Sequence, residues 1–431
     1  MESKIIKGGY SLISIITIII WILYLISMYI IVFWLLVLIE GYKKNKNMKL
    51  KRFPLISIAI PAYNEQKNII QTLDSIINLD YPKNKLQIIV VNDGSKDRTK
   101  TLVESFILKH KSYDITLINQ ENLGKGAALN KALKLCKGEF FTCLDADSFI
   151  KSDALKFIIP KFNDKRIGIV LPLMKVAHPR NLIQRIQWVE YLINLFYKNI
   201  MSLINCVHVA PGPFSVYRSK TLRSLGGFDE NNLTEDLEIS LRFQKSNYKI
   251  LQLMNTEVYT NVPDNLKGAY NQRNRWYKGT MFNMFKYRGM IGNKKYGDFG
   301  VMQMPRIVSS GFLAVFALGI TSYHYILLPL LKRLKDLTFI NINSTYILYE
   351  IKNFLDHMNL LDFNYTNLFF AFVSFIIGGV VIYYSHKHTK ENLFRYGIFT
   401  VSLYIFAYGI FASIVWAGVF LELLFNKIQK W

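Results

Sequence analysis

The chain has 431 residues, of which 51% are hydrophobic and 19% charged, and its formal net charge is +23. This composition is more apolar than that of an ordinary soluble domain. The positive charge does not predict a nucleic-acid partner, because much of it lies beside long apolar runs and no nucleic-acid-binding motif is present. The three cysteines are irregularly spaced, which excludes a disulfide framework or a zinc site and suits a reducing compartment.

Long runs without a charged side chain predict membrane spans. They cover residues 10–39, 307–331, 367–385 and 397–421, and each can cross a hydrocarbon core of roughly 30 Å. The first run is too long for a cleavable signal peptide. Basic residues crowd the segment 41–52 that follows it, so the positive-inside rule places the next region in the cytoplasm. We therefore expect a multi-pass protein of the cell membrane.

Short apolar runs alternate with helical patterns after the first span. The expected strands are residues 55–60, 86–91, 114–118 and 139–144, and the expected helices are residues 65–78, 97–110 and 126–135. This alternation predicts a mostly parallel sheet with helices on both faces. In such sheets, ligands bind outside the carboxyl ends of the strands.

Polar and acidic residues follow all four expected strands. The segments are "PAYNE" (61–65), "NDGSKD" (92–97), "QENLGKGAALN" (120–130) and "DADS" (145–148). Any one of them alone is most often a turn or the entry to a helix. Their occurrence at four successive strand ends indicates a ligand site.

The residue types in these segments suit a nucleotide diphosphate bound with a metal ion. Asp145 and Asp147 form an Asp-x-Asp pair that can approach one hard cation, and Mg²⁺ or Mn²⁺ takes such oxygen ligands together with substrate phosphates. Asp93 can accept hydrogen bonds from a base or a ribose. Lys125 lies between two glycines and can offset phosphate charge.

An acidic segment, "LTEDLEIS" (233–240), begins a further expected helix. Thr234 can cap this helix, and Glu235 and Asp236 are favoured there by the helix dipole. The alternative is chemical, because a carboxylate within hydrogen-bond reach of a sugar hydroxyl can act as a general base.

Taken together, these motifs resemble the inverting family-2 glycosyltransferases, and among them the processive membrane-embedded polysaccharide synthases that make poly-N-acetylglucosamine, hyaluronan, cellulose and chitin oligosaccharides. "PAYNE", "NDGS", "DADS", "TED" and "QRNRW" occur in the family's order over about residues 54–280. The resemblance implies an α/β Rossmann-like nucleotide-sugar-binding domain, called GT-A, combined with α-helical transmembrane segments.

The resemblance also implies roles for individual residues. The uridine part of UDP would contact Tyr63, Glu65 and Asp93. Asp145 and Asp147 would lie at the diphosphate and the metal, with Asp147 as the direct ligand, and Lys125 would lie near the nucleotide. The catalytic residues would be Asp236, as general base, and Glu235. The acceptor and the diphosphate would lie near Gln272, Arg275 and Trp276. Two departures stand out: the loop "PGPFSVYR" around Gly212 carries extra prolines, and Asn92 replaces a more usual aspartate.

The stretch "NQRNRWYKGT" (271–280) lies close to an apolar run. Gln272, Arg275 and Trp276 fall at i, i+3 and i+4, so on a helix they share one face, which we expect to look toward the active site. The other polar side chains of this stretch, Arg273, Tyr277 and Lys278, are interpreted as an interfacial anchor.

The expected organisation has four parts. They are residues 1–52 (membrane helix and basic linker), 53–265 (cytoplasmic GT-A domain), 266–306 (amphipathic interface region) and 307–431 (C-terminal membrane region). The expected function is transfer of a sugar from a UDP-sugar, with UDP-N-acetylglucosamine as the expected donor, to a growing polysaccharide that passes across the membrane. The alternative is a single addition to a lipid acceptor such as a polyprenyl phosphate or a ceramide-like lipid. The expected partners are the UDP-sugar, a glycan or lipid-linked acceptor and membrane lipids.

Overall fold

The computed structural model describes residues 50–331, 365–392 and 394–425, together with single positions between 18 and 37. The predicted first span, 10–39, and the basic linker lie mostly outside the described residues. The chain forms two compact units. One comprises residues 1–45 and 319–384, and the larger comprises residues 46–318 and 385–431.

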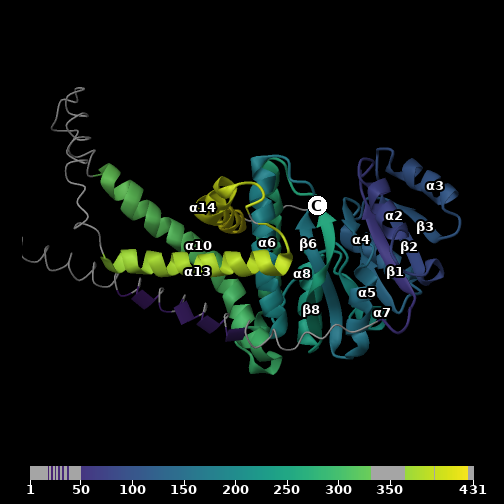
Figure 1. Cartoon of the computed structure of the whole chain (residues 1–431), viewed down its shortest axis with the longest axis horizontal. Coiled ribbons are helices and arrows are strands. Elements are labelled where there is room, and N and C mark those ends of the chain that lie inside the picture. Colours follow the sequence, from purple (N-terminus) through teal and green to yellow (C-terminus); the bar gives the residue numbers. More distant parts are fainter. Residues whose placement is uncertain are drawn as a thin grey trace, which may run out of the picture. The chain divides into compact units, whose positions relative to one another are not determined.

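The larger unit contains an eight-stranded mixed sheet with the order β3-β2-β1-β4-β7-β6-β8-β5 (Figure 1). The strands are β1 (Ile56–Ala62), β2 (Leu86–Asp93), β3 (Asp114–Gln120), β4 (Phe140–Cys143), β5 (Ser148–Ile150), β6 (Ile167–Val176), β7 (Val216–Arg218) and β8 (Lys249–Thr260). β1 to β4 pair in parallel, whereas β7 pairs antiparallel with both β4 and β6, and β5 pairs antiparallel with β8. The sequence therefore predicts β1 to β4 and misses the other four strands, among which β6 and β8 pair in parallel with each other.

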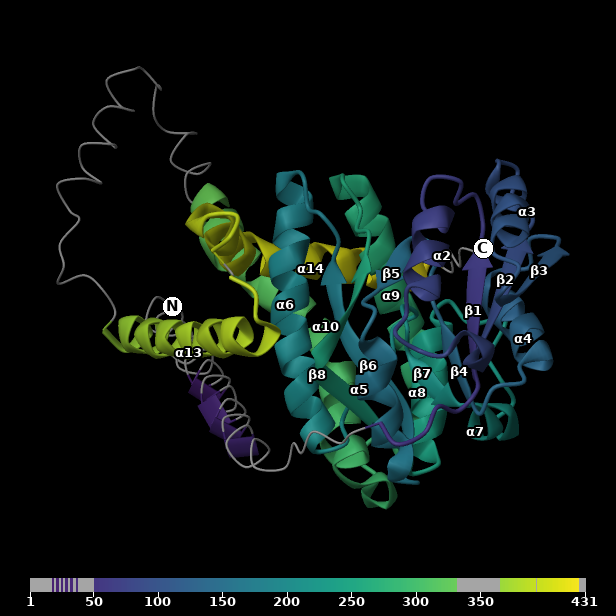
Figure 2. The same ribbon diagram turned by 45° about the vertical axis from the view of Figure 1, so that its right-hand side comes forward.

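Helices flank this sheet. They are α2 (Ile69–Ile77), α3 (Thr99–Lys109), α4 (Lys125–Leu135), α5 (Ala154–Ile158), α6 (Leu182–Leu203), α7 (Ser219–Ser224), α8 (Glu235–Lys245) and α9 (Leu266–Lys286). The first predicted helix begins four residues late, because the carbonyl of Glu65 accepts from the N–H groups of Asn68 and Ile69 in a turn. A capping box between Asn181 and Gln184 starts the long helix α6. Figure 2 shows α6 running beside β6 and β8, against which it packs.

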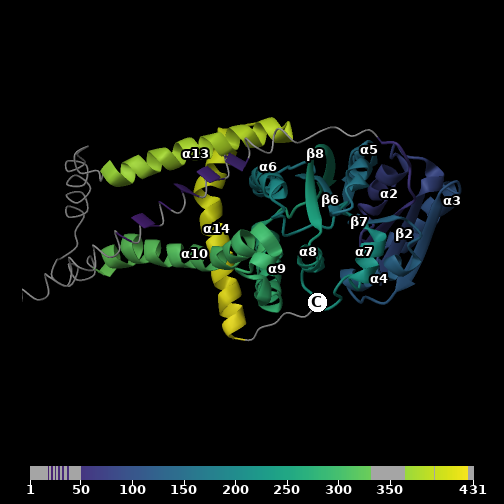
Figure 3. The same ribbon diagram turned by 90° about the horizontal axis from the view of Figure 1, so that it is seen from below.

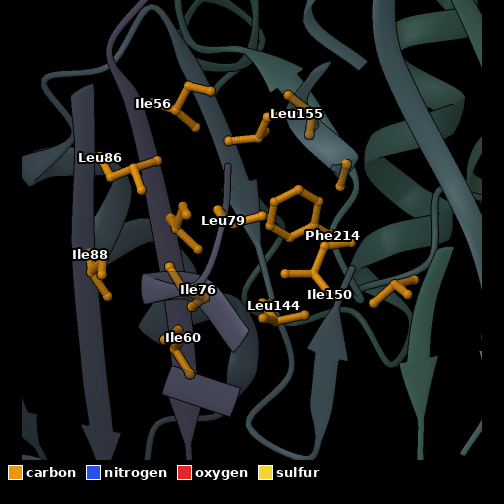
Figure 4. Close-up of a cluster of buried hydrophobic side chains, with 14 of the residues drawn as sticks. Ile56, Ile60, Ile76, Leu79, Leu86, Ile88, Leu144, Ile150, Leu155 and Phe214 are labelled. Atoms are coloured by element: carbon orange, nitrogen blue, oxygen red, sulfur yellow. The ribbon is translucent and has the colours of Figure 1, made fainter. Parts of the chain in front are cut away.

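A buried apolar cluster fixes the strand ends that carry the polar segments (Figure 4). Phe214, from the loop before β7, is fully buried in it, close to Leu144 and Ile150. Its N–H donates to the carbonyl of Cys143 at 2.7 Å, so the loop lies directly against the end of β4. Truncation of Phe214 to alanine would cost about 3–5 kcal/mol and release this loop.

Two helices are long and apolar enough to cross a membrane, judged by length and composition. They are Phe299–Ser322, which includes α10 (Met304–Ser322), and Ile398–Leu424, which is α14. Figure 3 shows α14 beside α9, where Trp416 stacks on Tyr277 with ring centroids 4.5 Å apart. The predicted third span, 367–385, falls within the helix α13 (Tyr365–Thr389).

Candidate active site

A cavity of about 620 Å³ opens within the larger unit. Eight predicted site residues line it: Lys125, Asp145, Asp147, Glu235, Asp236, Gln272, Arg275 and Trp276. They come from the start of α4, the loop after β4, the start of α8 and one face of α9. Tyr63, Glu65 and Asp93 lie outside this lining. The fold thus brings together residues that are spread over about 150 positions of the sequence.

The loop after β4 and the start of α4 form the acidic end of the cavity. Lys125 Nζ lies 2.5 Å from Asp145 Oδ1 and 3.3 Å from Glu235 Oε1. Asp145 Oδ1 is buried and, despite this ion pair, has no well-aligned hydrogen bond among the described residues. Gly212 leaves room beside it, because a Cβ there would lie 2.7 Å from Asp145 Oδ2 and 2.9 Å from Oδ1.

Asp147 and Glu65 add negative charge to the same end. Burial, the charge of Asp145 and that of Glu65 raise the pKa of Asp147 to about 7. Burial also raises the pKa of Glu65, although Asn68 donates a hydrogen bond to it. Such crowded carboxylates are stabilised by a cation. Two carboxylates that leave other positions to substrate oxygens fit Mg²⁺ or Mn²⁺.

The carboxylate of Asp93 is hydrogen-bonded to other groups of the protein. It accepts hydrogen bonds from Gln120 Nε2 at 2.7 Å, from the N–H of Leu123 at 2.9 Å and from that of Gly124 at 3.0 Å. These bonds hold the loop that precedes Lys125. The structure therefore gives Asp93 a loop-positioning contact that its place in the motif does not predict. Tyr63, in contrast, is 45% exposed.

Glu235 and Asp236 are adjacent in the chain but differ in their surroundings. Glu235 is buried and paired with Lys125. Asp236 is partly buried, and one of its oxygens accepts from the N–H of Leu237 at 2.8 Å. Burial, followed by the charge of Glu235, raises the pKa of Asp236 to about 6, against the opposing charges of Lys125 and Arg275. Of the two carboxylates, Asp236 is the better placed to accept a proton.

The acidic start of α8 is held by α9. Thr234 stands at the N-cap position but makes no side-chain cap to the helix, so its predicted capping bond is not formed. Instead, Thr234 Oγ1 accepts from Asn283 Nδ2 at 3.0 Å, and the same amide donates to Asn232 Oδ1 at 3.1 Å. Asn283 is fully buried. α8 and α9 are further joined by Glu238, which accepts from Lys286 at 2.9 Å.

The interfacial-anchor interpretation of Arg273 and Lys278 is wrong. Both side chains are buried, at 1% and 2% exposure. Arg273 pairs with Glu190 of α6 at 2.5 Å and lies over the ring of Trp276, 4.3 Å from its centroid. Lys278 pairs with Glu422 of α14 at 2.5 Å. Each buried cation pairs with a carboxylate from a distant helix, buried in Glu190 and partly exposed in Glu422, and the local sequence does not reveal these partners.

The wall supplied by α6 was not predicted. Glu190, Asn194 and Lys198 of α6 line the cavity, and His208 follows from the next loop. The signal was present in the sequence, because polar residues recur every four positions in the otherwise apolar run "VEYLINLFYKNI". Without a strand or motif beside it, that pattern does not indicate which cavity the helix faces.

Comparisons with known proteins agree with this geometry. Residues 57–226 match the family model described as "Glycosyl transferase family 2". The chain is 30% identical over 227 residues to the poly-beta-1,6-N-acetyl-D-glucosamine synthase of Staphylococcus epidermidis, covering 52% of this chain and 54% of the relative. The corresponding synthase of Staphylococcus aureus is 30% identical over 239 residues, covering 55% of this chain and 57% of the relative. The chain thus spans about half the length of these curated relatives.

A solved structure with a similar fold is the mannosyltransferase PcManGT of Pyrobaculum calidifontis, determined in complex with GDP-Man and Mn²⁺. It superimposes with a TM-score of 0.53 at 22% identity, over 78% of this chain and 95% of that one. At this identity the likeness concerns the fold alone, and it confirms the GT-A architecture that the family resemblance implied. Residues 57–226 of this chain therefore match the glycosyl transferase family 2 model, and the chain is similar in sequence to poly-N-acetylglucosamine synthases.

Proposed function

We propose that the chain is an inverting membrane glycosyltransferase that transfers N-acetylglucosamine from UDP-N-acetylglucosamine to the end of a growing polysaccharide. The observation that carries the proposal is the single cavity in which the Asp145–Asp147 pair, Asp236 and the Trp276 face of α9 meet. The donor and the polymer are inferred from the synthases to which the chain is 30% identical.

Asp236 is the general base of the proposed reaction. Its carboxylate removes the proton of the acceptor hydroxyl while that oxygen forms a bond to the anomeric carbon of the donor. The bond from that carbon to the UDP oxygen breaks on the opposite face, so configuration inverts and UDP leaves with the bonding electron pair. Such base catalysis contributes roughly 10²–10⁴-fold in rate.

Cationic side chains stabilise the charge that develops on the leaving diphosphate. Lys125 is held by Asp145 and Glu235 before the substrate binds, and Arg275 approaches from α9, where it lines the same cavity. Because Lys125 is already fixed in place, it needs little reorganisation in the transition state. The indole of Trp276 offers an apolar platform for the acceptor sugar.

Asp147 and Asp145 would hold a divalent metal ion, Mg²⁺ or Mn²⁺, together with diphosphate oxygens. When bound, the ion would supply Lewis-acid neutralisation of the diphosphate. Tyr63, Glu65 and Asp93 remain proposed for the nucleotide side, with Asp93 acting through the loop that it holds.

We further propose that the enzyme is a multi-pass protein of the cell membrane with a cytoplasmic catalytic domain, in contact with membrane lipids, and that the polymer crosses the membrane through its helices. The two apolar helices Phe299–Ser322 and Ile398–Leu424 support membrane association. The organisation into residues 1–52, 53–265, 266–306 and 307–431 is part of the same proposal.

The test is UDP release by the purified chain in detergent with a panel of UDP-sugars and either Mn²⁺, Mg²⁺ or a chelator. The proposal predicts release that is fastest with UDP-N-acetylglucosamine and is lost on chelation. Release of UDP from a different UDP-sugar only would show that the donor is that sugar and not UDP-N-acetylglucosamine. If no UDP is released with any donor or metal, the assignment as a transferase is overturned.

A further inference from the structure

α6 brings a second lysine, Lys198, into the cavity that contains Asp236. Within the described residues, Lys198 Nζ has neither a hydrogen bond nor an ion pair, whereas Lys125 has two carboxylate partners. An ammonium group that is partly buried without a partner is costly. A ligand that supplies an oxygen to Lys198 would remove this cost.

The electrostatic surroundings of the two lysines also differ. Burial lowers the pKa of Lys198 to about 8, and the carboxylate of Asp236 opposes that shift. Lys198 is therefore still mostly cationic at neutral pH. Lys125 is coupled to Asp145 and Glu235, at the acidic end of the cavity. Lys198 instead interacts electrostatically with Asp236, the proposed base. The attacking hydroxyl must lie next to this base.

His208 supplies a second donor to this part of the cavity. Gln303 Oε1 accepts from Arg306 Nε at 3.1 Å, so the amide nitrogen of Gln303 faces His208 Nδ1, 2.9 Å away. An amide nitrogen only donates, and Nδ1 must therefore accept. The imidazole then carries its hydrogen on Nε2. Burial, with the charges of Arg306 and Lys198, lowers the pKa of His208 to about 3, which keeps the ring neutral.

We propose that Lys198 and His208 form the acceptor subsite and bind the terminal sugar of the glycan beside Asp236. This inference rests on the proposed function. Both groups are hydrogen-bond donors, so their ligand must offer acceptor oxygens, such as the hydroxyl and carbonyl oxygens of a sugar. An N-acetylated sugar does so. A sugar with a free amine brings a second ammonium group next to Lys198, and this like-charge contact opposes binding.

The subsite is tested by oligosaccharide binding, which does not depend on turnover. Calorimetry on the full chain in detergent would compare an N-acetylglucosamine tetrasaccharide with the same tetrasaccharide after complete de-N-acetylation. The wild type should bind the N-acetylated form at least about tenfold more tightly. Lys198→Met should weaken that binding roughly 10- to 100-fold, as expected for loss of a charged hydrogen bond, and Lys198→Arg should retain most of it.

Three controls make the result specific. UDP affinity should stay within about twofold in Lys198→Met, because Lys125 serves the donor. His208→Phe should weaken tetrasaccharide binding in the same direction. Lys220→Met, at an exposed lysine of α7 outside the cavity lining, should bind both tetrasaccharide and UDP as the wild type does.

The subsite is overturned if Lys198→Met binds the N-acetylated tetrasaccharide as the wild type does, if the wild type binds neither tetrasaccharide, or if UDP affinity falls as far as tetrasaccharide affinity. A wild type that binds the N-acetylated tetrasaccharide but releases no UDP from any donor contradicts the proposed function while supporting the subsite. The two failures are therefore distinguishable.

Discussion

At the scale of single residues, the account depends on the different surroundings of two adjacent carboxylates. Glu235 forms an ion pair with Lys125 at 3.3 Å. Asp236, in contrast, has one oxygen that accepts no hydrogen bond from a side chain of the described residues. Asp236→Asn should therefore reduce transfer by roughly 10²–10⁴-fold while UDP binding is retained. Glu235→Gln should instead change the KM for the donor, because it frees Lys125. Steady-state kinetics of UDP release separate these effects, and near-normal turnover in Asp236→Asn would refute the base assignment.

The raised pKa of Asp236 makes a prediction about pH. A general base works only when ionised, and burial with the charge of Glu235 raises the pKa of Asp236 to about 6. The kcat/KM for the donor should thus be constant above that pH and fall about tenfold per pH unit below it. An unperturbed aspartate would keep its activity to about pH 4. A profile that stays flat down to pH 5 would mean that another group accepts the proton.

At the scale of elements, the contact between α8 and α9 should set the geometry of the base. A methyl group at Gly279 would lie 2.5 Å from Thr234 Cγ2, so Gly279→Ala must displace the start of α8. We expect turnover to fall by roughly tenfold or more, as small misplacements at a reacting centre do, with UDP affinity little changed. Gly268→Ala, elsewhere on α9, makes the same change in helix propensity without a contact to Thr234. Equal losses in both variants would show that the contact with Thr234 is not the cause.

The contact between α6 and α9 should matter for stability. Glu190 and Arg273 form a buried ion pair at 2.5 Å, and both are at most 4% exposed. Glu190→Gln leaves the guanidinium buried without its counter-charge, which is expected to cost about 3–5 kcal/mol. Thermal unfolding in detergent would measure the loss. The double variant Glu190→Gln, Arg273→Met should recover part of it; a double variant as unstable as the sum of the two single ones would contradict the pairing.

The sequence predicted those elements whose signals are local. β1 to β4 are apolar runs followed by polar turns, and the carboxyl ends of parallel strands meet at one edge of a sheet, so Asp145 and Lys125 could be expected to lie together. Long-range pairings could not be predicted. Arg273 and Glu190 are 83 residues apart, and Arg273 beside an apolar run has the same local pattern as an interfacial anchor. The loop contacts of Asp93 escaped prediction because they depend on the backbone of residues 123 and 124.

At the scale of the whole molecule, the net charge of +23 and the two apolar helices Phe299–Ser322 and Ile398–Leu424 support membrane association. The family-2 domain covers residues 57–226, yet the cavity is completed by α8 and α9, which follow it. α9 is in turn packed on α14, where Lys278 of α9 pairs with Glu422. α9 thus connects the proposed catalytic cavity with the apolar helix α14.

The central claim is that this cavity extends a glycan, and the size of the product tests it most directly. Purified protein in lipid vesicles would be given labelled UDP-N-acetylglucosamine with Mn²⁺, and its products separated by length, with Asp236→Asn in parallel. The account predicts a ladder of polymer from the wild type and none from the variant. A product that carries one sugar on a lipid, or a ladder that persists in Asp236→Asn, would contradict it.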